Sequence, residues 1–168
     1  MRGMLGLASL TLCALLLASP VLAQGAVISL GPATVDPNAP VEVTADSLRI
    51  NRATGNAVFS GNVRIVQGQL TLAADEVEVF YNEDNANDEP IERVLATGNV
   101  VMVNGPESAE AGRAEFRPAE NSLVMDGSVL LTQGRVILSG DRLVMDLLTG
   151  NGVVEGRVRS VLQPAGSE

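Results

Sequence analysis

The chain of 168 residues carries 20 acidic side chains against 11 basic ones, for a net charge of −9, and its aromatic content is only 2%. So acidic a chain is a poor partner for nucleic acid or an anionic surface. It has no histidine and a single cysteine, so it lacks the ordinary base–nucleophile pairs and the imidazole or thiolate zinc sites of enzymes.

The N-terminal residues 1–23 are predicted to be a secretory signal peptide. Residues 5–17 are mostly apolar, and Ala23 ends a small-residue cleavage site. The apolar run is shorter than the roughly 20 residues that span a bilayer, and an uncleaved anchor is the alternative. Cleavage would remove Cys13, and export of a chain without disulfides suits a bacterial periplasm.

Beyond the signal, residues 24–40 contain proline and glycine without any apolar period, and we expect a flexible leader there. From Val41 onward apolar and polar residues alternate, with Gly, Pro and Asn turn signals between the runs, which predicts strands throughout. One all-β domain is therefore expected over residues 41–163, with a tail at 164–168. The strands are predicted at residues 41–51, 56–67, 69–81, 91–104, 107–117, 122–133, 135–147 and 152–162.

Two short motifs recur along these strands. A glycine followed two residues later by valine occurs at residues 61–63, 98–100, 127–129 and 156–158, and an Ala-Asp type motif occurs at residues 45–48, 74–77, 111–114 and 140–143. The glycines are 37, 29 and 29 residues apart, which is a period of 29 with one insertion of eight that fits the acidic run 82–89. A fixed period of this size is typical of repeated units that stack on one another.

The motifs fall within strands that would otherwise be about 40 Å long, and glycine within a strand often marks a bend. Bent strands side by side make a folded-over sheet with one inward face. An ordinary closed core is the alternative to an open face. We expect the inward positions to be Leu48, Ile50, Val63, Ile65, Leu70, Leu72, Val77, Val79, Val100, Met102, Phe116, Leu123, Met125, Val129, Leu131, Val136, Leu138, Leu143 and Met145.

The motifs carry a resemblance to a known family. The segments T-A-D-S-L-R-I at 44–50, V-F-S-G-N-V-R-I at 58–65 and A-T-G-N-V at 96–100 resemble the OstA-like family, and within it the LptA type. The resemblance covers about residues 41–162. The third copy of the second motif departs from it, with Ala111-Gly112 in place of Ala-Asp.

The resemblance implies a bent, open antiparallel β-jellyroll (a β-taco) built from ~29-residue strand repeats. It implies a periplasmic carrier or bridge that shields the acyl chains of lipopolysaccharide in a hydrophobic groove between the inner and outer membranes. The groove would be lined by the inward residues given above. The implied partners are lipopolysaccharide, the inner-membrane module LptC, the N-terminal domain of outer-membrane LptD, and further copies of the chain joined edge to edge. No cofactor, metal or catalytic residue is implied.

Other interpretations remain open at this point. The same repeats suit a periplasmic scaffold that binds only proteins. A carboxylate-based glycan hydrolase is a third hypothesis, but adjacent Asp75 and Glu76 would point to opposite faces of a strand. The acidic run 83–92 offers oxygen ligands for calcium without the spacing of an EF-hand loop, and it reads more simply as a solvated loop.

Overall fold

The computed structural model describes residues 26–29, 39–82 and 91–163. The predicted signal peptide, most of the predicted leader, the acidic run from residue 83 to residue 90 and the tail lie outside the described residues. Within these ranges no helix is long and apolar enough to cross a membrane. The elements are the strands β1 (Ala26–Ser29), β2 (Val41–Thr44), β3 (Ser47–Ile50), β4 (Ala57–Gln67), β5 (Leu70–Tyr81), β6 (Ile91–Asn104), β7 (Glu107–Arg117), β8 (Ser122–Gln133), β9 (Val136–Asp146), β10 (Asn151–Glu155) and β11 (Arg159–Leu162), with a short 3₁₀ turn, η1 (Pro118–Glu120).

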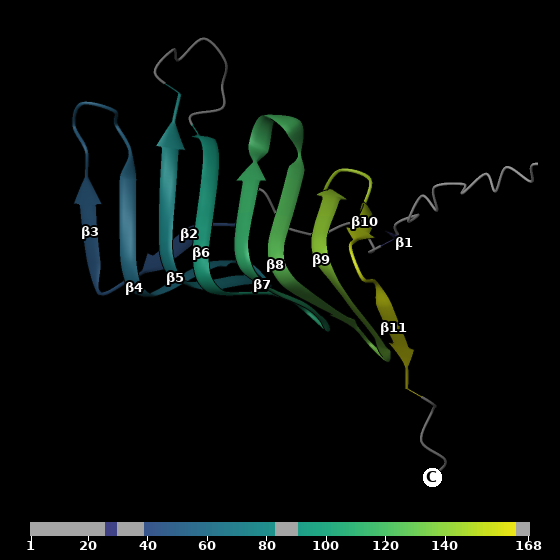
Figure 1. Ribbon diagram of the computed structural model, residues 1–168. Helices are drawn as coiled ribbons and strands as arrows, with labels where there is room; N and C mark the ends of the chain where they lie inside the picture. The colour runs from purple at the N-terminus through teal and green to yellow at the C-terminus, as the bar shows by residue number, and fades with distance from the viewer. Residues whose placement is uncertain (1–25, 30–38, 83–90, 164–168) are drawn as a thin grey trace, which may run out of the picture.

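All the strands join one antiparallel sheet whose order is β1-β10-β9-β8-β7-β6-β5-β4-β2, with β3 also paired to β4 and β11 also paired to β9. From β4 to β9 each strand pairs with its neighbours in sequence, as the turn signals predicted. The sheet does not close on itself, so it is the bent, open antiparallel β-jellyroll that the motifs led us to expect (Figure 1).

Each of the long strands β4 to β9 contributes to two layers. The register between neighbours shifts near the middle of each pair, for example between Ser60 and Val63 where β4 pairs with β5, and the pair of β5 with β6 has a second shift at its end, between Phe80 and Tyr81. Figure 1 shows the strands turning there from one layer into the other. The first layer contains β1, β3, β10 and residues 57–60, 76–81, 91–97, 113–117, 122–126 and 142–146; the second contains β2, β11 and residues 63–67, 70–74, 100–104, 107–111, 129–133 and 136–140.

The ends of the sheet differ from the prediction in two respects. The predicted strands 41–51 and 152–162 are each divided at a corner, into β2 and β3 and into β10 and β11. In addition, β1 falls within the segment expected to be a leader, and it pairs with β10 at the far end of the sheet from β2.

The core lies between the two layers and is entirely apolar in the described part of the chain, where no polar or charged residue is buried. Its largest fully buried side chains are those of Met125, Leu143, Val63, Val77, Val100, Val129 and Val154. They come from both layers, so burial of these side chains holds the two halves of each strand against one another.

Candidate functional site

The corners that create the two layers are built from the recurring motifs. Gly61 and Gly98 have φ of 79° and 76°, and the asparagines that follow them, Asn62 and Asn99, also have positive φ. Glycine adopts this region without strain, and asparagine tolerates it better than most residues. Two successive left-handed residues turn the strand sharply, which is why the motif reads Gly-Asn.

The aspartate of the second motif covers the glycine of the first. The Asn62 amide donates a hydrogen bond of 2.8 Å to the Asp46 carboxylate, and the Asn99 amide donates one of 2.9 Å to Asp75. A Cβ atom added at Gly98 would overlap the Asp75 carboxylate and lie 2.9 Å from its Cβ atom. The two motifs are therefore halves of one corner, formed across neighbouring strands.

The remaining two corners keep the bend with different contacts. Asp141 covers Gly156 and accepts a hydrogen bond of 3.0 Å from Arg157. In the third corner Gly112 stands where the others have aspartate, and a Cβ atom added at Gly127 would lie 3.4 Å from its Cα atom. This corner therefore bends without a carboxylate across it.

The inner faces of the two layers form the candidate functional site, and the predicted inward residues lie on them. Buried there are Val63, Val77, Val79, Val100, Leu123, Met125, Val129, Leu131, Leu138, Leu143 and Met145. Half-buried are Ile65, Leu70, Leu72, Met102, Phe116 and Val136. Leu48 and Ile50 are exposed, although they pair directly with Phe59 and Ala57 of the core and therefore share its face.

Burial on the inner face of β5 falls with distance from the corner. In β5, Ala74 beside the corner is buried, whereas Leu72 and Leu70 toward the open end of the layer are half-buried. In the first-layer half of the same strand, Val77 is buried and Tyr81 is 40% exposed. In this strand the inner face is driest beside the corner, whereas Ala57, Leu123 and Met145 remain buried at the mouth ends of β4, β8 and β9.

The two rims of the mouth differ in chemistry. Near the mouth of the first layer the inner face carries Tyr81 and Phe116, opposite Ile91 and Leu123. On the second layer the positions nearest the mouth are mixed. Leu70 and Val136 are apolar, whereas Glu107 and Gln133 are polar, and the Gln133 amide donates a hydrogen bond of 2.8 Å to Glu107. The mouth therefore has one apolar rim and one mixed rim.

Sequence reasoning missed the small members of the inner face. The buried alanines are Ala57, Ala74, Ala96, Ala109, Ala111 and Ala114, and Phe59 and Val154 also belong to the core or pack against it. Alanine carries little hydropathy signal, but these alanines follow the same alternation as the larger residues. That alternation is the signal that could have found them.

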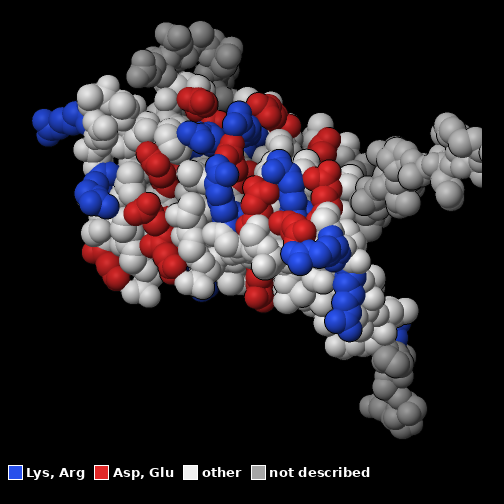
Figure 2. Space-filling model, in the orientation of Figure 1, with Lys and Arg blue, Asp and Glu red and all other residues white. Residues whose placement is uncertain are grey.

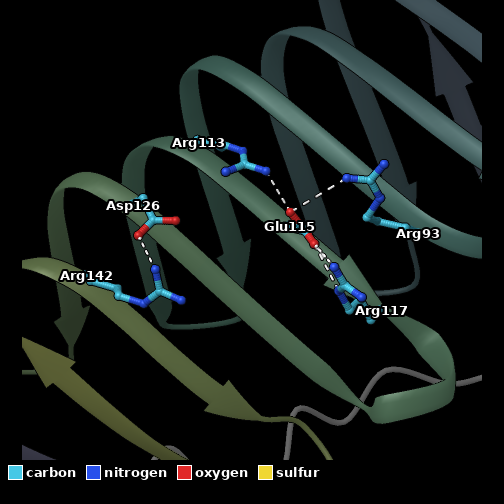
Figure 3. Close-up of polar contacts among 6 residues, drawn as sticks. All are labelled: Arg93, Arg113, Glu115, Arg117, Asp126 and Arg142. Carbon is cyan, nitrogen blue, oxygen red and sulfur yellow. Dashed lines mark hydrogen bonds and ion pairs between the residues drawn. The ribbon is translucent and has the colours of Figure 1, made fainter.

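The outer face of the first layer carries charged side chains of both signs, interspersed across the strands (Figure 2). At its centre the Glu115 carboxylate accepts hydrogen bonds from Arg113 at 2.6 Å and from Arg117 at 2.7 and 2.9 Å, with Arg93 at 3.9 Å (Figure 3). The Arg93 guanidinium also lies 3.8 Å from the centroid of the Phe80 ring. The charges therefore gather outside, away from the inner face.

The same cluster shifts the ionisation of its members. Burial raises the pKa of the Glu115 carboxyl, but the hydrogen bond from Arg117 and the positive charges of Arg117, Arg113 and Arg93 outweigh it, so the pKa is lowered overall. The hydrogen bond and charge of Glu115 raise the pKa of Arg117. Asp141 likewise raises the pKa of Arg157.

This geometry can be compared with known proteins. Residues 42–151 match the family model described as LptA/(LptD N-terminal domain) LPS transport protein. The chain belongs to this family. The matched residues include both motifs of the first three corners and the aspartate motif of the fourth, whose glycine motif lies beyond residue 151. The match confirms the family resemblance that the corner motifs indicated. The family is a transport family by description, and its name supports a role in lipopolysaccharide transport.

Individual relatives agree with this placement. An uncharacterized protein of Rhizobium meliloti, R00383, is 28% identical over 89% of this chain and 84% of its own length. The LPS-assembly protein LptD of Salmonella choleraesuis is 39% identical over 40% of this chain, which spans only 9% of that much longer protein. The crystal structure of LptH, the LptA homologous periplasmic component of the lipopolysaccharide transport device of Pseudomonas aeruginosa, superposes with a TM-score of 0.67, covering 77% of this chain and 99% of LptH at 20% identity. That structure confirms the fold.

Proposed function

We propose that this protein is a non-enzymatic periplasmic carrier of lipopolysaccharide, exported by its signal peptide, and that its inner faces shield acyl chains on the way to the outer membrane. The observation that carries the proposal is an inner surface of aliphatic, alanine and methionine side chains with no buried polar group among the described residues. Such a surface offers acyl chains a dry environment and no polar contact that would favour another ligand.

The energetics suit this role. Each methylene group of an acyl chain that leaves water contributes about 0.8 kcal/mol, so a few chains are held without any specific contact. The fall in burial along β5 supports entry from the mouth, because the half-buried second-layer residues Leu72 and Met102 can move away from the first layer without opening the buried corners. The aromatic rim at Phe116 and Tyr81 would meet the hydrocarbon first.

The two ends of the sheet support edge-to-edge partners. Leu48 and Ile50 are 51% and 65% exposed at one end, and Leu162 is 67% exposed at the other. Unpaired edge strands with exposed apolar residues are ready to accept another strand. We infer that these edges join LptC, the N-terminal domain of LptD, or a further copy of the chain, so that the inner faces become continuous.

Photo-crosslinking in cells tests the carrier. Leu72 and Met102 lie directly opposite one another on the inner face, and Thr71 and Val103 form the next pair, on the outer face of the same strands. A photoreactive amino acid at Leu72 or Met102 should give adducts with lipopolysaccharide, whereas the same amino acid at Thr71 or Val103 should not.

Adducts with proteins alone from the inner positions would instead support a periplasmic scaffold, the second candidate function. That candidate is favoured by the exposed edges, which suit protein partners whether or not lipid is bound. Equal labelling by lipopolysaccharide from both faces would contradict a defined lipid-binding surface.

A further inference from the structure

Strand β1 widens only one of the two layers. In the described part of the chain the second layer holds eight strands side by side, namely β2, the halves of β4 to β9, and β11. The first layer holds nine, namely β3, the other halves of β4 to β9, β10 and β1. Every neighbouring pair is antiparallel. The end strands of the second layer therefore run in opposite directions, whereas β3 and β1, at the ends of the first layer, run in the same direction.

This difference decides whether copies can join head to tail. When the β2–β3 end of one copy meets the β10–β11 end of another, β2 comes beside β11 and the two are antiparallel. In the first layer β3 comes beside β1, to which it is parallel, and β1 adds a strand spacing of about 4.8 Å that the second layer lacks. The two layers are joined at both ends by short corners, residues 45–46 and 156–158. With β1 in place, the two layers therefore cannot pair in step with the same neighbour.

Without β1, both layers would continue across the joint in the pattern of the repeat. Strand β10 would then meet β3, and the two are antiparallel. Their register follows from β4 and β5, where Val77 lies opposite Phe59. Leu48 has the place of Val77 in the aspartate motif, and Val154 has the place of Phe59 before the corner glycine. Leu48 of the incoming copy, which is 51% exposed in the single chain, would therefore lie opposite Val154.

Strand β1 already occupies this place on its own chain. It pairs with β10 so that Ala26 lies opposite Val154 and Val27 lies opposite Val153, and Figure 1 shows it beside β10. In the joint the same two residues of β10 would face Leu48 and Arg49 of the neighbour's β3. The edges of β2, β3 and β11 are free among the described residues, whereas β10 is covered. Covering an edge strand is a means by which native proteins prevent its pairing with another chain.

We propose that β1 is an autoinhibitory edge strand: it holds on β10 the place of the β3 strand of a second copy, and head-to-tail joining requires β1 to leave. The inference rests on the self-association proposed above and adds what controls it. The apparent affinity between copies is reduced by the fraction of molecules in which β10 is uncovered. If β1 is paired in about nine molecules of ten, its removal strengthens self-association about tenfold.

Cysteine pairing between copies tests whether β3 takes the place of β1. Two differently tagged full-length chains, one with Arg49→Cys and one with Val153→Cys, both with Cys13→Ala, are mixed and analysed without reduction. We expect little disulfide-linked heterodimer while β1 is present, and about tenfold more when residues 26–29 are deleted from the Val153→Cys chain. Val144 is the partner of Val153 on β9, one strand further from the edge. Arg49→Cys with Val144→Cys is the matched control and should give no cross-link in either background.

Locking β1 in place tests the proposal even if the deletion variant does not fold. Val27 and Val153 are directly opposite in the register, so a disulfide between Val27→Cys and Val153→Cys in one chain that also carries Cys13→Ala holds β1 on β10. Sedimentation should show weaker self-association of the oxidised protein than of the same protein after reduction.

The other outcomes overturn the proposal. Equal cross-linking with and without β1, or equal self-association of the oxidised and reduced proteins, would mean that β1 does not block the edge. Weaker association on deletion together with stronger association on locking would make β1 a part of the joint. Absence of self-association in every form would refute edge-to-edge joining and this inference with it, whereas lipopolysaccharide adducts from Leu72 would still support the carrier.

Discussion

The corner architecture predicts a specific difference between two glycine-to-alanine substitutions. Gly98 and Gly127 occupy the same position in successive repeats, with φ of 76° and 87°. At either position an alanine must adopt the left-handed region, which costs about 1–2 kcal/mol. Only at Gly98 does the new Cβ atom also collide with a side chain, because Asp75 covers Gly98 whereas Gly112 faces Gly127.

The collision at Gly98 adds a second cost. Relief of the 2.9 Å approach to the Asp75 Cβ atom requires that the aspartate move, and its carboxylate then loses the hydrogen bond from Asn99. An exposed hydrogen bond to a charged group lies near the lower end of about 1.5–3 kcal/mol. We therefore expect Gly98→Ala to lower the free energy of unfolding by about 3 kcal/mol and Gly127→Ala by roughly half of that.

Urea unfolding of the two variants and the wild type measures the difference, provided that the slope m is unchanged. Gly127 has the same left-handed backbone but no aspartate opposite, so Gly127→Ala is the control for the backbone cost alone. Equal destabilisation by the two substitutions would refute the reasoning that the aspartate and glycine motifs form a single steric unit across neighbouring strands.

Three further variants test separate parts of the structure. Val63→Asp places an unpaired carboxylate on the buried inner face and should lower the free energy of unfolding by about 3 kcal/mol or more. Val66→Asp, on the outer face of the same strand, should lower it by well under ~1 kcal/mol. Similar losses from the two variants would contradict the assignment of Val63 to the inner face. The pKa of Glu115 is lowered in the folded state. The ionised carboxylate therefore stabilises the fold above the ordinary carboxyl pKa, and this stabilisation is lost as pH falls through the folded-state pKa. Glu115→Gln should flatten that part of the curve of unfolding free energy against pH, and an unchanged curve would exclude the arginine cluster as the source of the pH dependence. Gly112→Ala should raise the free energy of unfolding by about 0.4–1 kcal/mol, because its φ is not left-handed and the new Cβ atom meets nothing closer than 3.6 Å; thermal denaturation showing a loss would mean that the third corner needs the space.

The corners could be predicted from sequence because their cause is local. Two successive left-handed residues select Gly-Asn, and the repetition of that pair at a fixed spacing gave the bends, the strands and the meander. The sequence also shows that Gly112 replaces the aspartate of the motif, but it does not show whether the strand still bends there. The structure shows that the bend persists there, since Gly127 keeps its positive φ without an aspartate opposite.

Other features depend on register and distance, which a single sequence does not carry. The ion pairs of Glu115 with Arg93 need the pairing of β6 with β7 to be known residue by residue. The pairing of β1 with β10 joins segments more than a hundred residues apart, and Ala26–Ser29 is too short to show a clear alternation of apolar and polar residues. The exposure of Leu48 and Ile50 follows from their place at the end of an open sheet, which alternation alone does not distinguish from a covered core.

Fluorescence from a single introduced tryptophan tests most directly whether the inner face takes up hydrocarbon, because the chain has no native tryptophan. Phe116→Trp places the indole on the half-buried rim of the inner face, and Phe80→Trp places it on the outer face beside Arg93. Lipopolysaccharide with brominated acyl chains should quench Phe116→Trp strongly and leave Phe80→Trp nearly unchanged. Equal quenching of both variants, or quenching of Phe80→Trp alone, would contradict the account.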